Sequence, residues 1–329
     1  MNTITRRTFL ALTAAGLAAG MAHAQPQAQP QDWPQRPIRI IVSQPPGAAP
    51  DILARLLGDK MAKTLGQPII VENRPGSGNI IGAQAAARAT PDGYTYYLAT
   101  TAPLAVNPYT FKSLPYDPVK DFAPVGMVGG SYFYIAVNND VPVKTLEELI
   151  ALAKSQPEKI SFSSDGTKGF AGIMGEWINK RAGIKMLHVP YTSAAQSLQE
   201  TIAGRTQVTI QATPVAMPFV NRGAIRPIAI TSPQKVEGFN VPPVAQTLPG
   251  VQMFGWLAFV TQKDVPAPIV AKFNQALDKA LKEPDMKKRI DEMGFTSEGA
   301  GTPAALGQYI KAEYERWGKI TSEIGMVAD

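Results

Sequence analysis

A turn of small residues before the first predicted helix could bind an anion. The sequence Pro46-Gly47-Ala48-Ala49 follows an apolar strand predicted at 40–43, and an amphipathic helix is predicted at about 51–65. Because the turn carries almost no side chain, its backbone N–H groups could approach a ligand closely. The helix N-terminus adds unpaired N–H groups and a positive dipole end, which favour a carboxylate as they favour a phosphate. The alternative is an ordinary strand-to-helix connection whose small residues serve packing.

Side chains that could perform catalysis or bind a metal are scarce. The chain has no cysteine and two histidines, so thiolate nucleophiles, disulfides and cysteine-ligated metals are excluded. His23 falls in a predicted signal peptide, which leaves His188 alone and rules out a multi-histidine metal site within one chain. His188 lies at the end of an apolar strand, where we interpret it as a structural residue. No G-x-S-x-G nucleophile motif occurs, and we expect no catalytic residue, no metal site and no cofactor.

Two patterns superficially suggest nucleotide or nucleic-acid binding. Gly76, Gly78 and Gly82 follow a predicted strand, but the next strand ends in Thr100-Thr101 instead of the acidic residue of a dinucleotide site. Lys287-Lys288-Arg289 lies among acidic residues, as expected for a solvated helix face. We therefore expect no nucleotide cofactor and no nucleic-acid partner.

The N-terminus has the form of an export signal. Arg6-Arg7 precedes an apolar run at 9–21, which ends in the cleavage signal Ala22-His23-Ala24. The arginine pair followed by Phe9-Leu10 resembles a twin-arginine signal, with a Sec signal as the alternative. We predict a signal peptide at 1–24 that is cleaved after Ala24, a disordered mature N-terminus at 25–32, and a periplasmic protein. Loss of the two arginines lowers the formal net charge from +6 to +4, a mild excess that suits an anionic ligand.

The remaining chain alternates between predicted strands and helices. This order favours mostly parallel sheets covered by helices, and 45% hydrophobic residues can supply the core. Thr145 with Glu148 three residues later predicts a capping box at the start of a helix. Strands are predicted at 40–43, 69–71, 96–100, 133–137, 160–163, 187–189, 208–211 and 225–230. Helices are predicted at 51–65, 145–155, 169–181, 194–203, 214–221, 267–282, 284–293 and 303–324.

Several stretches, in order along the mature chain, resemble the Bug family, the periplasmic solute receptors of the tripartite tricarboxylate transporter type. Residues 40–95 follow the family pattern of strand, PPGGxTD, helix, LGQPVVVENRPGAGGxIG, helix and PDGYT. Residues 114–129 (LPYDPVKDFAPVGMVG) match LPYDPxKDFxPVxLVG, and shorter matches occur at 144–150, 187–191 and 254–259. Each match is weak alone, but the ordered set is highly specific. Ala48 replaces the family's second turn glycine and Pro50 replaces its threonine, so the turn should bind with fewer bonds or a shifted geometry.

The resemblance implies an α/β fold of the two-lobed, type II periplasmic-binding-protein kind, with mostly parallel sheets flanked by helices and a ligand cleft between the lobes. Crossings near Gly129-Gly130 and near Thr231-Ser232 would divide the chain into domain one, residues 33–129 plus 232–329, and domain two, residues 130–231. Open α/β sheets bind ligands beyond the carboxyl ends of their strands. The loops that follow strands should therefore face the cleft.

Four such loops supply the candidate ligand-binding residues. Threonine hydroxyls in the second loop can donate to a carboxylate, and the third loop precedes a helix, where simple capping is the alternative role. Asp165 replaces a common glycine and brings a negative charge into an anion site. Gln211 stands where the family commonly has an aspartate, and this neutral group should disfavour amino acids as ligands. The candidates are Pro46, Gly47, Ala48, Ala49 and Asp51 in the first loop, Thr100, Thr101 and Ala102 in the second, Ser164, Asp165, Gly166 and Thr167 in the third, and Gln211, Ala212 and Thr213 in the fourth.

The resemblance implies an extracytoplasmic solute-binding protein, which we expect to be a monomer that performs no catalysis. It would capture a small organic carboxylate and present it to a membrane transporter. One alternative is an enzyme on the same fold, whose acid or base would be Asp165 or His188. Another is a periplasmic sensor subunit of a signalling system, which differs from a transport receptor only in its membrane partner.

Overall fold

The computed structural model describes residues 32–328. The predicted signal peptide, its cleavage site and residues 25–31 of the predicted disordered segment lie outside the described residues. Residues Pro34–Asp329 form one compact unit, and this unit contains both sheets described below. No helix within residues 32–328 is long and apolar enough to cross a membrane.

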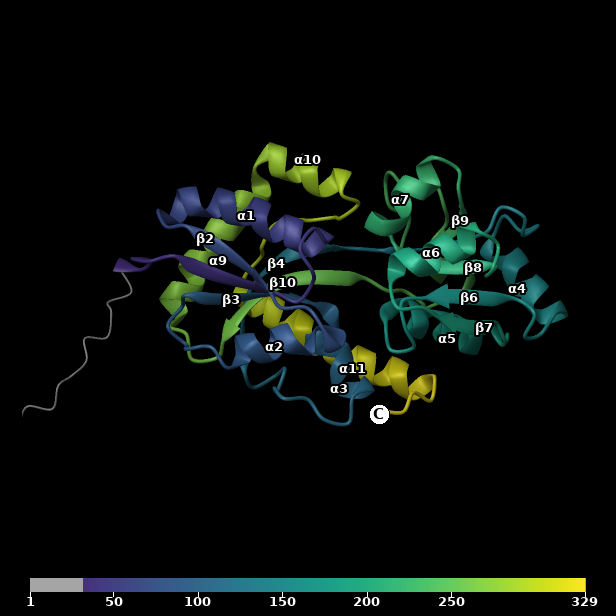
Figure 1. Cartoon of the computed structure of the whole chain (residues 1–329), viewed down its shortest axis with the longest axis horizontal. Helices are drawn as coiled ribbons and strands as arrows, with labels where there is room; N and C mark the ends of the chain where they lie inside the picture. Colours follow the sequence, from purple (N-terminus) through teal and green to yellow (C-terminus); the bar gives the residue numbers. More distant parts are fainter. Residues whose placement is uncertain (1–31, 329) are drawn as a thin grey trace, which may run out of the picture. The chain divides into compact units, whose positions relative to one another are not determined.

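The first sheet has five strands in the order β2-β1-β3-β10-β4 (Figure 1). Its side chains alternate between two covered faces, as the pleat of a strand requires. The ring of Tyr96 stacks on Phe273 with 3.6 Å between ring centroids, whereas the hydroxyl of the next residue, Tyr97, lies 2.6 Å from Ser43 Oγ. The strands are β1 (Ile38–Val42), β2 (Ile69–Asn73), β3 (Thr95–Thr100), β4 (Phe122–Ser131) and β10 (Gly255–Gln262).

The second sheet has the same plan, with its strands in the order β7-β6-β8-β5-β9. Its buried strands are short and rich in apolar or hydroxyl residues, such as Phe133–Val137, which is buried along its whole length. The strands are β5 (Phe133–Val137), β6 (Ser161–Ser164), β7 (Leu187–Pro190), β8 (Val208–Ala212) and β9 (Arg226–Ile230).

One strand in each sheet runs against the other four. β10 pairs antiparallel with both β3 and β4, and β5 pairs antiparallel with both β8 and β9, while the remaining pairs are parallel. Because four of the five strands in each sheet point the same way, the prediction of mostly parallel sheets is confirmed. The sequence analysis missed β4 and β10 as strands, and with them the antiparallel pairs of the first sheet.

Helices cover both faces of each sheet. Figure 1 shows α1 and α10 on one side of the first sheet and α2 and α11 on the other. All eight predicted helices are confirmed within two residues at each end. The longer helices are α1 (Ala49–Leu65), α2 (Ile80–Ala87), α4 (Leu146–Ser155), α5 (Phe170–Ala182), α6 (Ala194–Ile202), α7 (Thr213–Asn221), α9 (Ala267–Lys282), α10 (Pro284–Glu292) and α11 (Pro303–Glu323). Single turns occur at η2 (Ser77–Asn79), η3 (Ala102–Val106), α3 (Asn107–Thr110) and α8 (Val244–Thr247).

The predicted cap of α4 is also confirmed. Thr145 Oγ1 accepts a hydrogen bond from Glu148 N at 3.2 Å. The Glu148 carboxylate accepts from the N–H of Lys144 at 2.5 Å, one residue before the position that a standard capping box uses.

Two chain segments join the sheets, and they lie side by side. β4 ends at Ser131 and β5 begins at Phe133, so Tyr132 alone separates the strands. The return path leaves β9 at Ile230 and enters β10 at Gly255. The hydroxyl of Thr231 ties the paths together, because it accepts from Phe133 N at 2.9 Å and donates to Met253 O at 2.6 Å.

Candidate functional site

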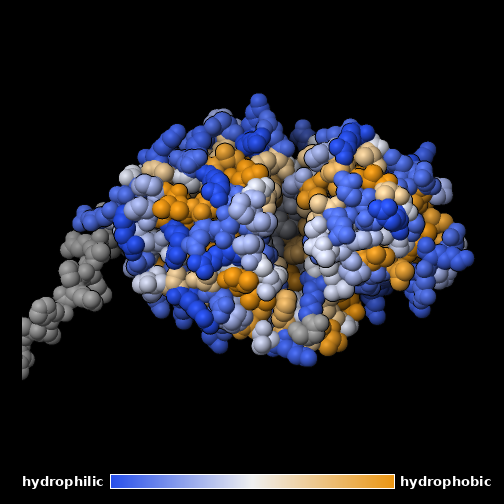
Figure 2. All heavy atoms as spheres, viewed as in Figure 1, coloured by the Kyte–Doolittle hydropathy of each residue, from blue (hydrophilic) through white to orange (hydrophobic). Residues whose placement is uncertain are grey.

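A cavity of about 740 Å³ lies between the two sheets, and Figure 2 shows it as a groove. Strand-following loops from both sheets line it, as expected for ligand sites in α/β proteins. The lining includes these ten candidate residues: Ala48, Ala49, Thr100, Thr101, Ala102, Asp165, Gly166, Thr167, Gln211 and Ala212. The other five candidates, Pro46, Gly47, Asp51, Ser164 and Thr213, are not part of the lining.

The turn before α1 is shaped from within by Asp51. Gly47 has a φ of +84°, which favours glycine, and its N–H donates to Asp51 Oδ2 at 2.8 Å. Asn73 Nδ2 donates to the other carboxylate oxygen at 2.8 Å, and Arg55 forms an ion pair with it at 2.9 Å. Asp51 is only 2% exposed. Burial alone would raise the pKa of Asp51, but the hydrogen bonds from Arg55, Gly47 and Asn73 outweigh it and hold the pKa below its usual value.

Asp51 therefore positions the turn and does not face the cavity. The N–H of Gly47 is occupied by Asp51, and Pro50 has no N–H to offer. Ala48, Ala49 and Pro50 at the start of α1 do line the cavity. The backbone donors left for a ligand are those of the first helical turn, at Ala49 and Asp51.

The hydroxyl oxygens of the second loop accept hydrogen bonds from within the protein. Thr101 Oγ1 accepts from the backbone N–H of Trp256 at 2.9 Å and lies 3.4 Å from the carbonyl oxygen of the same residue. Thr100 Oγ1 accepts from Asn79 Nδ2 at 3.2 Å. Both threonines line the cavity. Thr101 thus connects the end of β3 to β10, and the hydroxyl of Thr100 keeps its hydrogen for a ligand.

The third loop, between β6 and α5, is held in shape by Ser164. Its hydroxyl accepts from Gly166 N at 3.2 Å and lies 3.0 Å from Gly166 O and 2.6 Å from His188 Nε2. Ser164 is fully buried. The His188 ring stacks on Phe162 with 4.4 Å between ring centroids, and burial lowers the pKa of His188. Ser164 and His188 therefore position this loop from behind the cavity wall.

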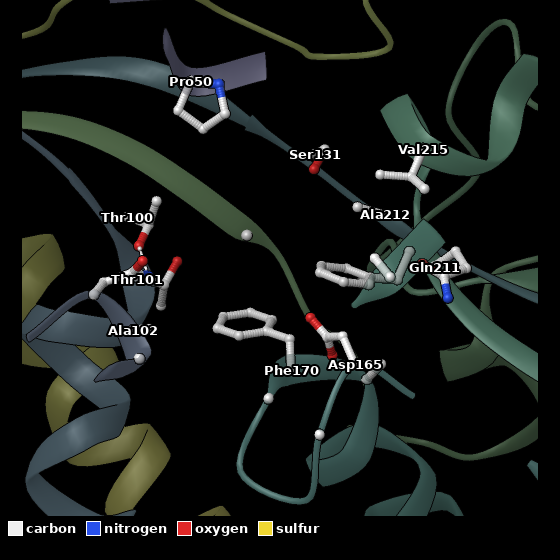
Figure 3. A pocket seen from close by; sticks show the side chains of 18 of the residues that line it. Pro50, Thr100, Thr101, Ala102, Ser131, Asp165, Phe170, Gln211, Ala212 and Val215 are labelled. Carbon is white, nitrogen blue, oxygen red and sulfur yellow. Dashed lines mark hydrogen bonds between the residues drawn. The ribbon is translucent and has the colours of Figure 1, made fainter. Parts of the chain in front are cut away.

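Asp165 has the opposite orientation from Ser164. Figure 3 shows its carboxylate directed into the cavity, close to Phe170. Burial in the cleft raises the pKa of Asp165, and its own backbone amide is the only group that lowers it. The sequence analysis expected a negative charge here, and the structure brings that charge into the cavity.

The fourth loop contributes less to the cavity than we expected. Both amide hydrogens of Gln211 are used inside the second sheet's lobe, because Nε2 donates to Ser197 Oγ at 2.5 Å and to Thr209 Oγ1 at 3.1 Å. Gln211 is 2% exposed and can offer a ligand only its Oε1 as an acceptor. Thr213 is fully buried and donates to Gly294 O at 2.8 Å. It fastens the start of α7 and does not reach the cavity.

Comparison with known proteins identifies the family. A family model described as the tripartite tricarboxylate transporter family receptor matches residues 53–326. The chain belongs to this family. It is 31% identical over 300 residues to a UPF0065 protein of Pseudomonas sp. strain P51, covering 89% of this chain and 88% of that relative. It is 30% identical over 293 residues to BugT of Bordetella pertussis, covering 88% of this chain and 90% of BugT.

Solved structures of similar receptors share the fold. R. palustris Rpa4515 with adipate has a TM-score of 0.82 and 27% identity, covering 91% of this chain and all of that one. The periplasmic binding protein BugD has a TM-score of 0.77 and 25% identity, covering 90% of this chain. MatC from Rhodopseudomonas palustris with bound malate has a TM-score of 0.75 and 27% identity, covering 87% of this chain. The predicted two-lobed periplasmic-binding-protein fold is confirmed.

The receptor also has aromatic cavity walls that the sequence analysis missed. Phe170 stands between Phe133, at 5.4 Å between ring centroids, and Trp317, at 4.7 Å. Trp256 is oriented by its indole N–H, which donates to Glu313 Oε2 at 3.3 Å. The sequence analysis missed these rings because their pattern is that of core residues and because they come from distant segments. For Trp256, the family match at 254–259 was the one feature of the sequence that could have indicated a role in the site. The missed aromatic lining residues are Phe111, Phe133, Phe170, Trp256 and Phe295.

Among the described residues that line the receptor cavity, Asp165 and Lys168 are the charged ones. The Lys168 ammonium lies 4.5 Å from the ring centroid of Phe111, which belongs to the opposite wall. Burial, followed by the nearby Lys112, lowers the pKa of Lys168. Within residues 32–328 no cluster of three or more acidic or histidine side chains could hold a metal ion.

Proposed function

We propose that this protein is an extracytoplasmic solute-binding protein that captures a small organic carboxylate and presents it to a membrane transporter. The observation that carries the proposal is the cavity between the two sheets, lined by Ala48 and Ala49 at the N-terminus of α1. Backbone N–H groups and the helix dipole favour a carboxylate at that place. The family membership and the adipate and malate of two similar structures support the same ligand class.

We further propose that the two sheets are the cores of two domains that close on the ligand. Residues 33–129 plus 232–329 would form domain one, and residues 130–231 domain two. The two connections between the sheets support this division, because Thr231 at the start of one is tied by hydrogen bonds to Phe133 and to Met253. A pair of adjacent connections can absorb a hinge rotation with few backbone changes. We propose that the protein acts as a monomer.

We propose that no chemistry takes place in the cavity. Ser164, His188 and Glu176 superficially resemble a nucleophile, a base and an acid, since Ser164 Oγ lies 2.6 Å from His188 Nε2. His188 Nδ1, however, is 3.6 Å from Glu176 Oε1, beyond hydrogen-bonding distance. Ser164 is fully buried and does not line the cavity. A substrate in the cavity could not reach its hydroxyl.

The test of binding uses ligand release and thermal shift. Mass spectrometry of acids released from the purified protein should identify a carboxylate, and that acid at about 100 times its Kd should add about 2.7 kcal/mol of stability. Ala212→Phe, which fills the cavity, should abolish the shift, while Ala151→Phe on the exposed face of α4 should preserve it. No released acid, together with no shift across a broad acid panel, would contradict the proposal. A new product after long incubation would contradict the absence of chemistry.

Export is proposed to follow the twin-arginine route, with cleavage after Ala24. Replacing Arg6 and Arg7 by lysine should leave the uncleaved precursor in the cytoplasm. The mature N-terminus can be read by mass spectrometry of the periplasmic protein. Normal periplasmic accumulation of the lysine variant would assign the signal to the Sec route.

A further inference from the structure

Asp165 differs from two other acids near the cavity because no other side chain among residues 32–328 is hydrogen-bonded to it or forms an ion pair with it. Asp51, behind the turn before α1, accepts from Gly47 N and Asn73 Nδ2 and pairs with Arg55. Glu313, behind Trp256, accepts from two indole N–H groups at 3.3 Å each and from Arg316 at 2.9 Å. Both acids are nearly inaccessible and fully engaged in the fold.

The carboxylate of Asp165 faces the cavity instead. Among residues 32–328 no other side chain donates a hydrogen bond to it or forms an ion pair with it, and only its own backbone amide contributes. Asp165 is exposed to the open cleft, where water can solvate its carboxylate. A charged acceptor that is shielded from water is unfavourable without a donor. A ligand that closes the cavity and displaces its water would have to supply that donor.

The neighbours of Asp165 restrict what the donor can be. Lys168, three residues along the same loop, also lines the cavity and would repel a ligand ammonium group. A second ligand carboxylate placed at Asp165 would meet a like charge. Gln211 cannot donate to the ligand, because Ser197 and Thr209 occupy both of its amide hydrogens. An uncharged hydroxyl group fits these conditions, since it donates one hydrogen bond without adding charge.

The aromatic walls favour an apolar ligand body. Phe133 and Phe170 stack on each other beside Asp165, and Trp256 lines the cavity from β10. A cavity of about 740 Å³ is large enough for a ring or a chain of several carbons. Flat apolar surfaces of this kind bind aromatic rings and methylene chains through contact area and edge or stacking interactions.

We propose that Asp165 accepts a hydrogen bond from a hydroxyl group of the ligand, so that the protein selects a carboxylic acid whose apolar body carries a hydroxyl group. This inference rests on the proposed function, because it assumes that the ligand's carboxylate binds at the start of α1. Sites built to bond a hydroxyl reject the analogue that lacks it, because the site's polar group is then left unpaired.

The experiment is calorimetric titration of the mature protein with matched pairs of acids. The pairs are 4-hydroxybenzoate with benzoate and 6-hydroxyhexanoate with hexanoate, and adipate supplies a second carboxylate in place of the hydroxyl. In the wild type we expect the hydroxy acid of a pair to bind at least about tenfold more tightly than its plain partner, the effect of one hydrogen bond to a charged acceptor. Asp165→Asn and Asp165→Ala should reduce the preference to under about threefold and improve adipate binding.

A matched control separates the role of Asp165 from a general loss of negative charge. Asp140→Asn removes an exposed carboxylate from the same half of the chain and should leave the hydroxyl preference unchanged. Equal or tighter binding of the plain acids by the wild type, or an unchanged preference in both Asp165 variants, would overturn the inference while leaving the carboxylate receptor intact. Binding of no acid by the wild type would overturn the proposed function itself, and this inference with it.

Discussion

The turn before α1 and the loop before α5 are built alike and use their aspartates in opposite ways. Each follows a parallel strand, precedes a helix and contributes small residues to the cavity wall. Asp51 turns inward, where three partners satisfy it and where it fixes the turn. Asp165 turns outward into the cavity without a side-chain partner. The difference teaches that an aspartate in a strand-to-helix loop is structural or ligand-facing according to the donors that surround it.

The largest effect should come from removing the structural acid. Asp51→Ala leaves Gly47 N and Asn73 Nδ2 without their acceptor, so unfolding should become easier by about 2 kcal/mol. The melting temperature should fall by about 4 °C, and ligand affinity should fall because the turn loses its shape. Asp59→Asn, an exposed acid on the same helix, is the control and should change neither value. If Asp51→Ala had the stability of the wild type, Asp51 would not be a structural residue, and the proposed difference between the two loops would be wrong.

The loop between β6 and α5 should be weakened by loss of the Ser164 hydroxyl. Ser164→Ala removes the contacts to Gly166 and His188 at the cost of about 1 kcal/mol in stability, measured by urea unfolding. Ligand affinity should decrease as well, because Asp165 and Gly166 lose their support. Ser155→Ala at the exposed end of α4 is the matched control. If affinity were unaffected while stability fell, the loop would not need Ser164 for binding.

A smaller effect should follow from the cavity cation. Lys168→Gln should weaken binding of acids by about threefold at low ionic strength and by less in high salt, because the attraction is screened. Lys154→Gln changes the net charge equally at an exposed position of α4 and should have no effect. Titrations at two salt concentrations would check this. A salt-independent loss would mean that the contact of Lys168 with Phe111, and not its charge, matters for binding.

The two aspartates should also differ in the sign of their pH dependence. The folded-state pKa of Asp51 is below 3.8, so its stabilisation is present above pH 3.8 and is lost as the pH falls through the folded value. The folded-state pKa of Asp165 is above 3.8, so its charge opposes folding at neutral pH, and this penalty disappears as the pH falls toward 3.8. In melting curves from pH 3 to 7, Asp51→Asn should be less stable than wild type near pH 7, and Asp165→Asn slightly more stable. Both differences in stability from the wild type should become smaller as the pH falls. If the two variants changed stability in the same direction near pH 7, the comparison of the two aspartates would be contradicted.

The elements of the fold were largely predictable from the sequence, because helix periodicity and caps such as Thr145 are local signals. β4 and β10 were not, because β10 enters the first sheet only after the chain has returned from the second, and no local pattern encodes that pairing. The loops of the cavity were predictable from strand order. The orientation of Asp51, Ser164 and Gln211 was not, because it depends on partners such as Asn73, His188 and Ser197, which are distant in sequence.

The most direct test of the binding mode is a crystal structure of the mature protein with 4-hydroxybenzoate. We predict the ligand carboxylate within about 3 Å of backbone N–H groups at Ala49 or Asp51, directly or through one water. We predict its hydroxyl within about 3 Å of the Asp165 carboxylate. A ligand carboxylate bound at Lys168, with the start of α1 making no contact to it, would contradict the assignment of the first turn as the anion site.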